Sequence, residues 1–254
     1  TTLESSYNTG IGYLALFSNT RGQFNTAVGA TALRSNSTGT RNNAFGLDAL
    51  NYNTSGSQNV VMGAGALTNN TTGNYLVAIG DTAGRDIADD TTDNTTSDYS
   101  IYIGADTKAL ADNGQNEIVI GYNAIGLGSN TVVLGNSSIT TTALRANVGI
   151  GTTAPQSLLD VQGPTGTGAA SAGILTLATK ETTIVDGDQL GRINFNAPLE
   201  ADGSDSILVG ASIWAEADDT FSATVNSTEL VFATGTTAAA TEKMRIDRDG
   251  NVGI

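Results

Sequence analysis

Residues 25–50, NTAVGATALRSNSTGTRNNAFGLDAL, decide the fold because one pattern occurs in them twice. The pattern is N-x-A-apolar-G-x-x-A-L, and a run of Asn, Ser, Thr and Gly follows each copy. The second copy starts 17 residues after the first, at Asn42 against Asn25. Self-similarity at a fixed short period is typical of repeat architectures, so this pattern governs the rest of the chain.

A glycine marks every copy of the pattern. The spacing between these glycines is 17 residues over the first copies, breaks once, is 17 again, and then shortens to 14. The residue before each glycine is always apolar, which predicts that one side of the chain faces a continuous core. The marker glycines are Gly12, Gly29, Gly46, Gly63, Gly80, Gly104, Gly121, Gly135 and Gly149.

A period of 14 or 17 residues is too short for a helical hairpin and suits one coil of an all-β solenoid or β-roll. Val, Ile and Phe adjoin the glycines, while turn-forming residues fill the intervals. We therefore expect a short strand, a turn and a second short strand in each coil. Strand alternation predicts that the residue before the glycine faces the core. The opposite face carries Ala27, Ala44 and Ala78, and its small side chains favour self-association.

The composition excludes several classes of function. The chain has 25 acidic and 11 basic residues, and the bases are scattered singly, which disfavours a nucleic-acid partner. Without His or Cys there is no Ser-His-Asp triad, no cysteine nucleophile and no usual zinc site. No apolar run is long enough to insert into a membrane. We expect no cofactor, no metal and no enzymatic activity.

The sequence changes character after about residue 150. We predict a repetitive β-roll over 1–146, a connector and linker over 147–172, and an antiparallel β domain over 173–254. A β-sandwich and a trimeric β-prism tip both fit the last part. The final NVGI repeats a motif that runs on after residue 150, so we expect the chain to continue beyond Ile254. Candidate strands lie at 174–179, 191–195, 206–215, 222–225, 229–234 and 243–247.

Two sets of motifs carry a resemblance to known families. EIVIGYNAIGLGSNTVVLGNSSIT, residues 117–140, is similar to the head repeats of trimeric autotransporter adhesins, whose coils form a left-handed parallel β-roll packed as a trimer. RANVGIGTTAPQSLLDVQG, residues 145–163, resembles the distal parts of tailed-bacteriophage fibre and spike proteins. GDQLGRINF, GASIWAEADDTF, TELVFAT and TEKMRIDRDGNVGI share the second resemblance. It implies a homotrimer and, in such proteins, a following intramolecular chaperone domain of the endosialidase type.

The resemblance implies a structural homotrimeric viral fibre segment that presents a host-receptor-binding surface on the virion, as a tail or head fibre. The implied partners are a host-cell surface polysaccharide or outer-membrane protein, and other virion proteins. One alternative is the head of a bacterial trimeric adhesin. A second is a polysaccharide-degrading tailspike, for which a pair of carboxylates would be needed. Surface charge explains the candidate pairs without catalysis: Asp186 with Asp188, Asp202 with Asp205, and Asp218 with Asp219.

The acidic interruption between Arg85 and Tyr99 is the first candidate binding region. Its carboxylates suit calcium by ligand type, but their spacing matches no calcium loop, so we predict a solvated loop. The string Asp247-Arg248-Asp249-Gly250-Asn251 predicts a β-turn. We expect Trp214 in a core and Tyr102 exposed on the small-residue face. The candidate receptor-binding residues are Asp86, Asp89, Asp90, Asp93, Tyr99, Asp218 and Asp219.

Overall fold

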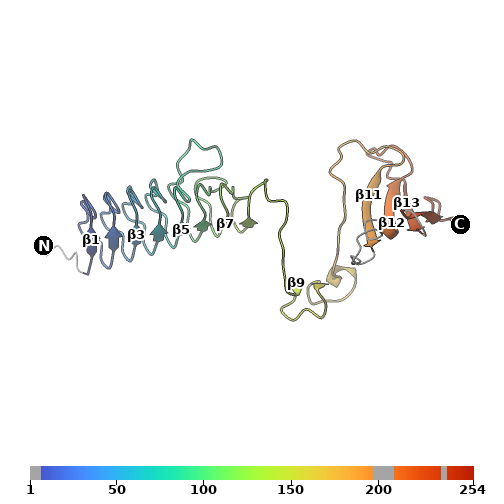
Figure 1. Ribbon diagram of the computed structural model, residues 1–254, viewed down its shortest axis with the longest axis horizontal. Helices are drawn as coiled ribbons and strands as arrows, with labels where there is room; N and C mark the ends of the chain where they lie inside the picture. The colour runs from blue at the N-terminus through green and yellow to red at the C-terminus, as the bar shows by residue number, and fades with distance from the viewer. Residues whose placement is uncertain (1–6, 197–208, 236–238) are drawn as a thin grey trace, which may run out of the picture. The chain divides into compact units, whose positions relative to one another are not determined.

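The computed structural model describes residues 7–196, 209–235 and 239–254. The carboxylates of Asp202 and Asp205 lie outside these ranges. The chain divides into two compact units, Thr1–Ala143 and Leu144–Ile254 (Figure 1). Strands and turns build both units, and the described residues contain one 3₁₀ turn, η1 (Ala169–Ser171), and no α-helix.

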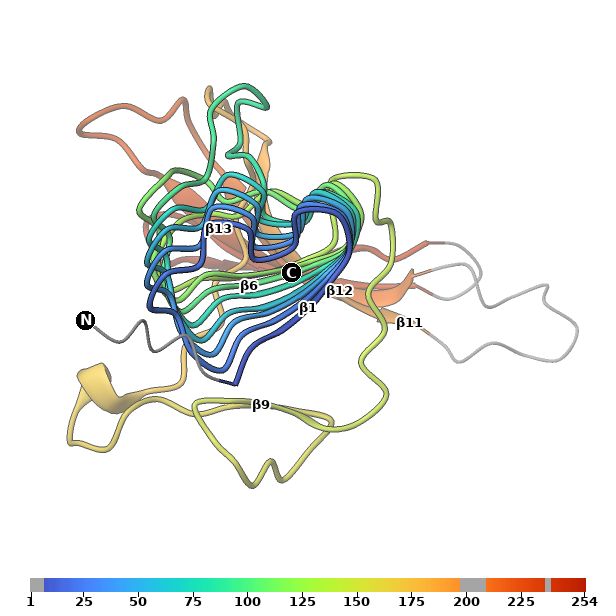
Figure 2. The same cartoon turned by 90° about the vertical axis from the view of Figure 1, so that its left-hand side faces the viewer.

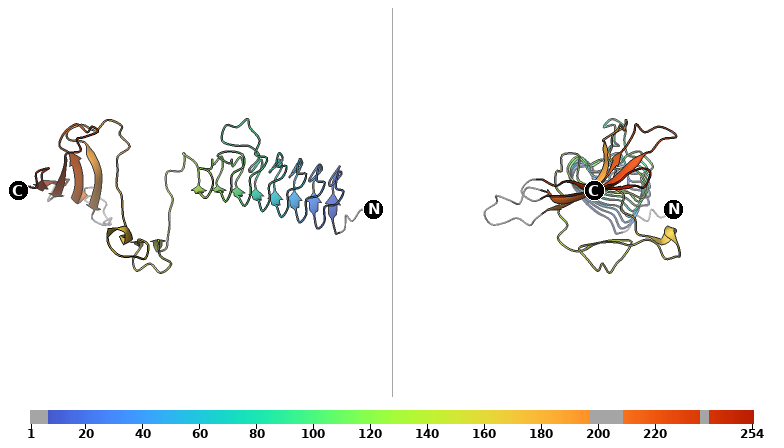
Figure 3. Two further views of the ribbon diagram at one scale, coloured as in Figure 1. Left: turned by 180° about the vertical axis from the view of Figure 1, so that it is seen from behind. Right: turned by 90° about the vertical axis from the view of Figure 1, so that its right-hand side faces the viewer.

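The first unit is a parallel β-solenoid, which confirms the predicted fold class. Each coil contributes one strand of three residues, and the strands pair in chain order into one eight-stranded sheet (Figures 1 and 3). The second strand predicted for each coil is wrong, because turns occupy the rest of the coil. The strands are β1 (Thr9–Ile11), β2 (Thr26–Val28), β3 (Asn43–Phe45), β4 (Val60–Met62), β5 (Val77–Ile79), β6 (Ile101–Ile103), β7 (Ile118–Ile120) and β8 (Val132–Leu134).

The glycine after each strand is required by both backbone conformation and space. From Gly12 to Gly121 the φ angles of the marker glycines lie between 127° and 145°, a region that side chains disfavour. A Cβ on Gly63 would also lie 2.5 Å from the carbonyl carbon of Gly80 in the next coil. The coils therefore stack backbone on backbone at this corner, and the fixed spacing of the glycines follows from that contact.

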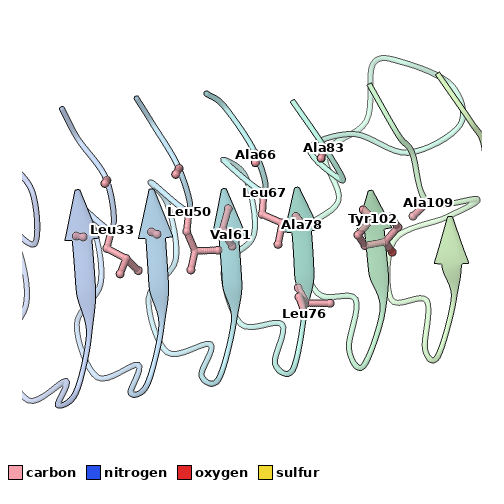
Figure 4. Close-up of a cluster of buried hydrophobic side chains, with 14 of the residues drawn as sticks. Leu33, Leu50, Val61, Ala66, Leu67, Leu76, Ala78, Ala83, Tyr102 and Ala109 are labelled. Atoms are coloured by element: carbon pink, nitrogen blue, oxygen red, sulfur yellow. The ribbon is translucent and has the colours of Figure 1, made fainter. Parts of the chain in front are cut away.

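The structure reverses the two predicted strand faces. From β2 to β7 the middle residue of each strand points into the coil and is fully buried, as are Ala27, Val61 and Tyr102. The residue before the glycine points outward, so Met62 is 50% exposed and Leu134 is 57% exposed. Both the core assignment and the expected exposure of Tyr102 are therefore wrong. The reason is space, because one small strand residue and a leucine from the opposite wall fill the narrow coil (Figure 4).

Asparagines run through the coils as two internal hydrogen-bonded ladders. In the first, Asn42 Nδ2 donates to the Gly56 carbonyl at 2.8 Å, and its backbone N–H donates to Asn25 Oδ1 at 2.9 Å. In the second, Asn53 Nδ2 donates to Asn36 Oδ1 at 2.8 Å. The side chains of Asn25, Asn36, Asn42 and Asn53 are fully buried. Buried amides need such partners, so the ladders both satisfy them and lock one coil to the next.

The ninth marker glycine does not belong to the roll. β9 (Val148–Ile150) pairs in parallel with β10 (Leu159–Val161) in the second unit, and the roll sheet ends at β8. Gly149 sits in the middle of its strand, and the glycine that follows the strand is Gly151, with φ of 78°. The apparent 14-residue step from Gly135 to Gly149 therefore does not mark a further coil.

The second unit contains a five-stranded antiparallel sheet, which confirms the predicted antiparallel region. Trp214 is 8% exposed and packs with Val231 and Ala233, as expected for a core residue. The strands predicted at 174–179 and 222–225 are wrong. Leu177 lies against Gly191 without joining its ladder. The sheet consists of β11 (Gln189–Asn196), β12 (Val209–Ala217), β13 (Thr228–Thr234), β14 (Thr241–Ile246) and β15 (Val252–Gly253).

Candidate functional site

The acidic interruption is an insertion into one coil of the roll. From Gly80 to Gly104 the coil spans 24 residues, seven more than its 17-residue neighbours. The added chain doubles back on itself through an antiparallel bridge between Asp86 and Asp93. Figure 2, which looks along the roll, shows the insertion projecting on the side away from the strands. It therefore leaves the outer face of the sheet uncovered.

Hydrogen bonds inside the insertion shape its tip. The Asp89 carboxylate accepts from the Thr92 hydroxyl at 2.7 Å and from the backbone N–H groups of Thr91 and Thr92 at 3.0 and 2.8 Å. These bonds stabilise the charged form and lower the pKa of Asp89 to about 2. Asp89 therefore acts as the turn residue of the tip.

The other predicted residues of the insertion face different partners. Asp86 pairs with Arg85 at 2.7 Å, and Asp90, 69% exposed, lies 3.4 Å from the Lys108 ammonium of the next coil. Tyr99 does not join the acidic tip. It is 57% exposed and stacks on Tyr75, with ring centroids 4.9 Å apart.

Asp93 turns toward the body of the roll, where it meets residues that the sequence analysis did not single out. Its Oδ1 accepts from Asn69 Nδ2 at 2.5 Å, and the pair borders an open groove of about 660 Å³. The groove is lined by Asp93 with Ser35, Tyr52, Thr54, Asn69, Thr71 and Thr95. Repeat register could have found these residues, because Ser35, Tyr52 and Asn69 are successive 17-residue neighbours and Asp93 follows at 24 residues.

The C-terminal end of the insertion is fixed by the following coil. The Asp112 carboxylate accepts from the backbone N–H and hydroxyl of Thr95 at 2.9 and 2.6 Å, and from the Thr96 N–H at 2.8 Å. Burial alone would raise the pKa of Asp112, but these hydrogen bonds outweigh it and hold the pKa below its ordinary value. Asp112 thus positions Thr95, which forms one end of the groove.

The remaining predicted site residues lie in the second unit. Asp218 pairs with Arg248 at 3.3 Å, and Asp219 accepts from the Thr220 backbone N–H at 2.7 Å. The string from Asp247 forms the predicted turn, because Asp247 Oδ1 accepts from the N–H groups of Asp249 and Asn251 at 3.0 and 2.8 Å. These residues therefore make contacts within the second unit.

The outer face of the roll sheet is the second surface of note. Its side chains form two parallel rows without charge: the row at the third strand residue is apolar throughout, and the row at the first strand residue is polar in β1–β3 and apolar from β4 to β8. The exposed members are Ile11, Phe45, Val60, Met62, Ile79, Val132 and Leu134. We call this surface the outer stripe. Adjacent strands lie about 4.8 Å apart, so eight strands extend the stripe over roughly 34 Å.

Across residues 7–196, 209–235 and 239–254, acidic side chains do not gather in threes at a distance that would hold a metal ion. The same ranges contain no helix that is long and apolar enough to cross a membrane. No protein-family model matches the chain, and no curated protein matches it. The chemistry of the two surfaces is therefore the basis for assigning a function.

Proposed function

We propose that the chain is a segment of a homotrimeric viral fibre that presents a host-receptor-binding surface. It acts on the virion, in a tail or head fibre, next to other virion proteins. The observation that carries this proposal is the outer stripe. The proposed role of the fibre segment is mechanical, since the stacked coils would hold a receptor-binding surface at a distance from the particle.

The outer stripe supports self-association because parallel sheets are normally covered on both faces. The last three strands of the roll, β6 to β8, lack the polar alternation of a solvated face. Their sequences are IYI (Ile101–Ile103), IVI (Ile118–Ile120) and VVL (Val132–Leu134). The coil itself covers the inner face of the sheet. A long, flat apolar surface that the described coils leave exposed is typical of a protein–protein contact.

Other copies of the same chain are the partner that fits this surface best. The strands repeat at one spacing, so an identical stripe matches it step by step along the roll. The strand residues are uncharged, so copies can meet there without burying an unpaired charge. Three copies around one axis would bury the three stripes together, and this agrees with the resemblance of residues 117–140 to trimeric adhesin heads.

The test is the mass of the native particle in solution, by light scattering after size exclusion and by native mass spectrometry. We expect three times the chain mass of 25.8 kDa. Because the chain has no cysteine, Met62→Cys introduces a single thiol in the outer stripe. Oxidation should then link two chains of each particle covalently. A stable folded monomer would contradict the proposal.

The matched control is Leu127→Cys, at an apolar residue that is 69% exposed and lies in a loop outside the strands. This variant should keep the native mass and form no covalent pair under the same oxidation. Equal cross-linking of both variants would mean that the chains meet at random, and the outer stripe would lose its assignment. Cysteine replaces one exposed side chain in each case, so both variants are expected to fold.

A further inference from the structure

We infer that the groove beside the insertion binds a neutral linear oligosaccharide. The inference rests on the proposed function, because it names the ligand of the host-binding surface. The groove is built within the first unit alone. Its lining residues lie in turns and in the insertion, outside the strands. The insertion projects on the side away from the strands (Figure 2), so association through the outer stripe leaves the groove open.

Two rows of side chains from successive coils form the walls of the groove. One row consists of Ser35, Tyr52, Asn69 and Asp93, and the other of Thr54, Thr71 and Thr95. Neighbours within a row come from adjacent coils, about 4.8 Å apart, so the longer row extends roughly 14 Å along the roll axis. The threonine row therefore presents the same polar group at equal steps, and the longer row presents one side chain per coil, which suits a ligand that is itself a repeating polymer.

The groove is rigid before any ligand arrives. Thr54 Oγ1 donates to the Thr71 carbonyl at 3.0 Å, and Thr71 Oγ1 donates to the Thr95 carbonyl at 3.1 Å. Between the two rows in each coil lies an asparagine of the buried ladder, Asn53 or Asn70. A site held in this way loses little conformational freedom on binding, which allows weak polar contacts to yield measurable affinity.

The lining has the mixed chemistry that sugars need. Tyr52 is 49% exposed and offers a flat ring against which the C–H face of a pyranose can pack. Asp93 accepts hydrogen bonds, and Asn69 can donate and accept. The threonine hydroxyls already donate within the protein, so they offer acceptor lone pairs to sugar hydroxyls. A purely apolar ligand would displace water from these groups and offer no hydrogen bond in return.

The charge of the groove selects a neutral ligand. Its lining includes the Asp93 carboxylate and no Lys or Arg, and the whole chain carries a net charge of −14. Sialic acids, phosphorylated sugars and nucleic acids would therefore approach a repulsive field and find no cation in the lining. Neutral hexose and deoxyhexose polymers meet no such penalty.

The experiment titrates the full chain, at its native mass, with neutral oligosaccharides of glucose, mannose, galactose and rhamnose. Saturation-transfer NMR detects weak binding and calorimetry measures it. An oligomer of sialic acid is the acidic counterpart. We expect at least one neutral oligosaccharide to bind and the sialic acid oligomer not to bind. Tyr52→Ala and Asp93→Asn should each weaken binding at least tenfold, while Tyr52→Phe should stay within about threefold because it keeps the ring.

Tyr122→Ala is the matched control, since this tyrosine is 68% exposed and lies outside the groove. It should bind as the unchanged chain does. The inference is overturned if no neutral oligosaccharide binds, if the sialic acid oligomer binds better, or if the Tyr52 and Asp93 variants bind unchanged. Native mass is measured on every variant, so failure of the groove can be told apart from failure of the proposed trimer.

Discussion

The regular coils through β5 and the later coils through β8 use one backbone with different filling. In the regular coils a small residue such as Ala44 faces a leucine such as Leu50 across the interior, and both are fully buried. At the insertion the two sizes are exchanged, since Gly84 stands in the leucine position and Tyr102 in the alanine position. The strand register passes through this change unbroken, with Ala78 opposite Tyr102.

This exchange shows that backbone contacts determine the shape of the coil, and that side chains from either wall can fill its interior. A Cβ on Gly84 would lie 2.7 Å from Tyr102 Cδ2, so the tyrosine ring occupies the space that a leucine fills elsewhere. Burial, with the charge of Glu117 added, raises the pKa of Tyr102 to about 12. Regular coils thus provide stability, and the boundary with the later coils provides the insertion and the groove.

The largest expected effect comes from breaking the glycine backbone contact that occurs in both the regular coils and the later coils. Gly63→Ala places a Cβ against the Gly80 carbonyl at a φ of 145°. Neither backbone can shift without disturbing the next coil, so we expect a loss of at least about 5 kcal/mol in the free energy of unfolding. Chemical denaturation measures this loss, and hydrogen exchange should locate it in the coils on either side.

Gly65→Ala is the control for strain without a backbone collision. Gly65 has φ of 65°, and the matching position of other coils holds Thr31 and Asp48. We expect a loss of no more than about 1 kcal/mol. If both glycine variants are equally tolerated, stacking of the glycine corners is not what fixes the coil.

The exchange of volumes at the insertion predicts the next largest effect. Tyr102→Ala removes a fully buried ring and should cost about 3–5 kcal/mol. Gly84→Leu alone should also destabilise the roll, because the new side chain meets the tyrosine ring. Combining the two changes recreates the regular pattern of alanine and leucine.

We therefore expect the double variant to lose less stability than the two single losses added together, which a double-mutant cycle of denaturation midpoints would measure. The coupling should reach about 1–3 kcal/mol in favour of the pair. If the two losses simply add, Gly84 and Tyr102 do not share one volume. Packing would then not explain the exchange of side-chain sizes between the regular coils and the later coils.

The smallest predicted effect is the acid sensitivity of the insertion anchor. The folded pKa of Asp112 lies below its ordinary value of about 3.9, so its contribution is present above pH 4 and is lost as the pH falls through the folded pKa. The side chain is partly exposed to solvent, so we expect less than about 1 kcal/mol after screening. Amide exchange at Thr95 and Thr96 should accelerate relative to the rest of the roll over this pH range.

Asp112→Asn should remove this acid dependence while keeping one acceptor oxygen for the two threonines. Asp89→Asn is the matched control, because that carboxylate also has a lowered pKa but lies at the tip of the insertion. It should alter exchange at Thr91 and Thr92 alone. Unchanged acid dependence in the Asp112 variant would contradict the role of Asp112 as the anchor.

The candidate site was predictable from the sequence only in part. The acidic composition of residues 86–93 singled out the insertion, including Asp93. Tyr52 and Asn69 were not found, because each looks like one polar residue in an Asn- and Thr-rich turn. Their position beside a groove is visible only when the coils are stacked. The 24-residue coil then places Asp93 next to Asn69, and the two residues are too far apart in the chain for a short motif to include both.

The sequence by itself determined the solenoid, the coil length and the position of the glycine corners. These follow from local chemistry, because a φ near 140° and a backbone contact permit only glycine, and the spacing of such glycines is visible in the chain. The tertiary structure alone decided which strand face is the core. A strand of three residues alternates equally well in either sense, and hydrophobicity favoured the larger side chains of Met62 and Ile79. The narrow interior admits Val61 and Ala78 instead, and the larger residues are left on the outer stripe.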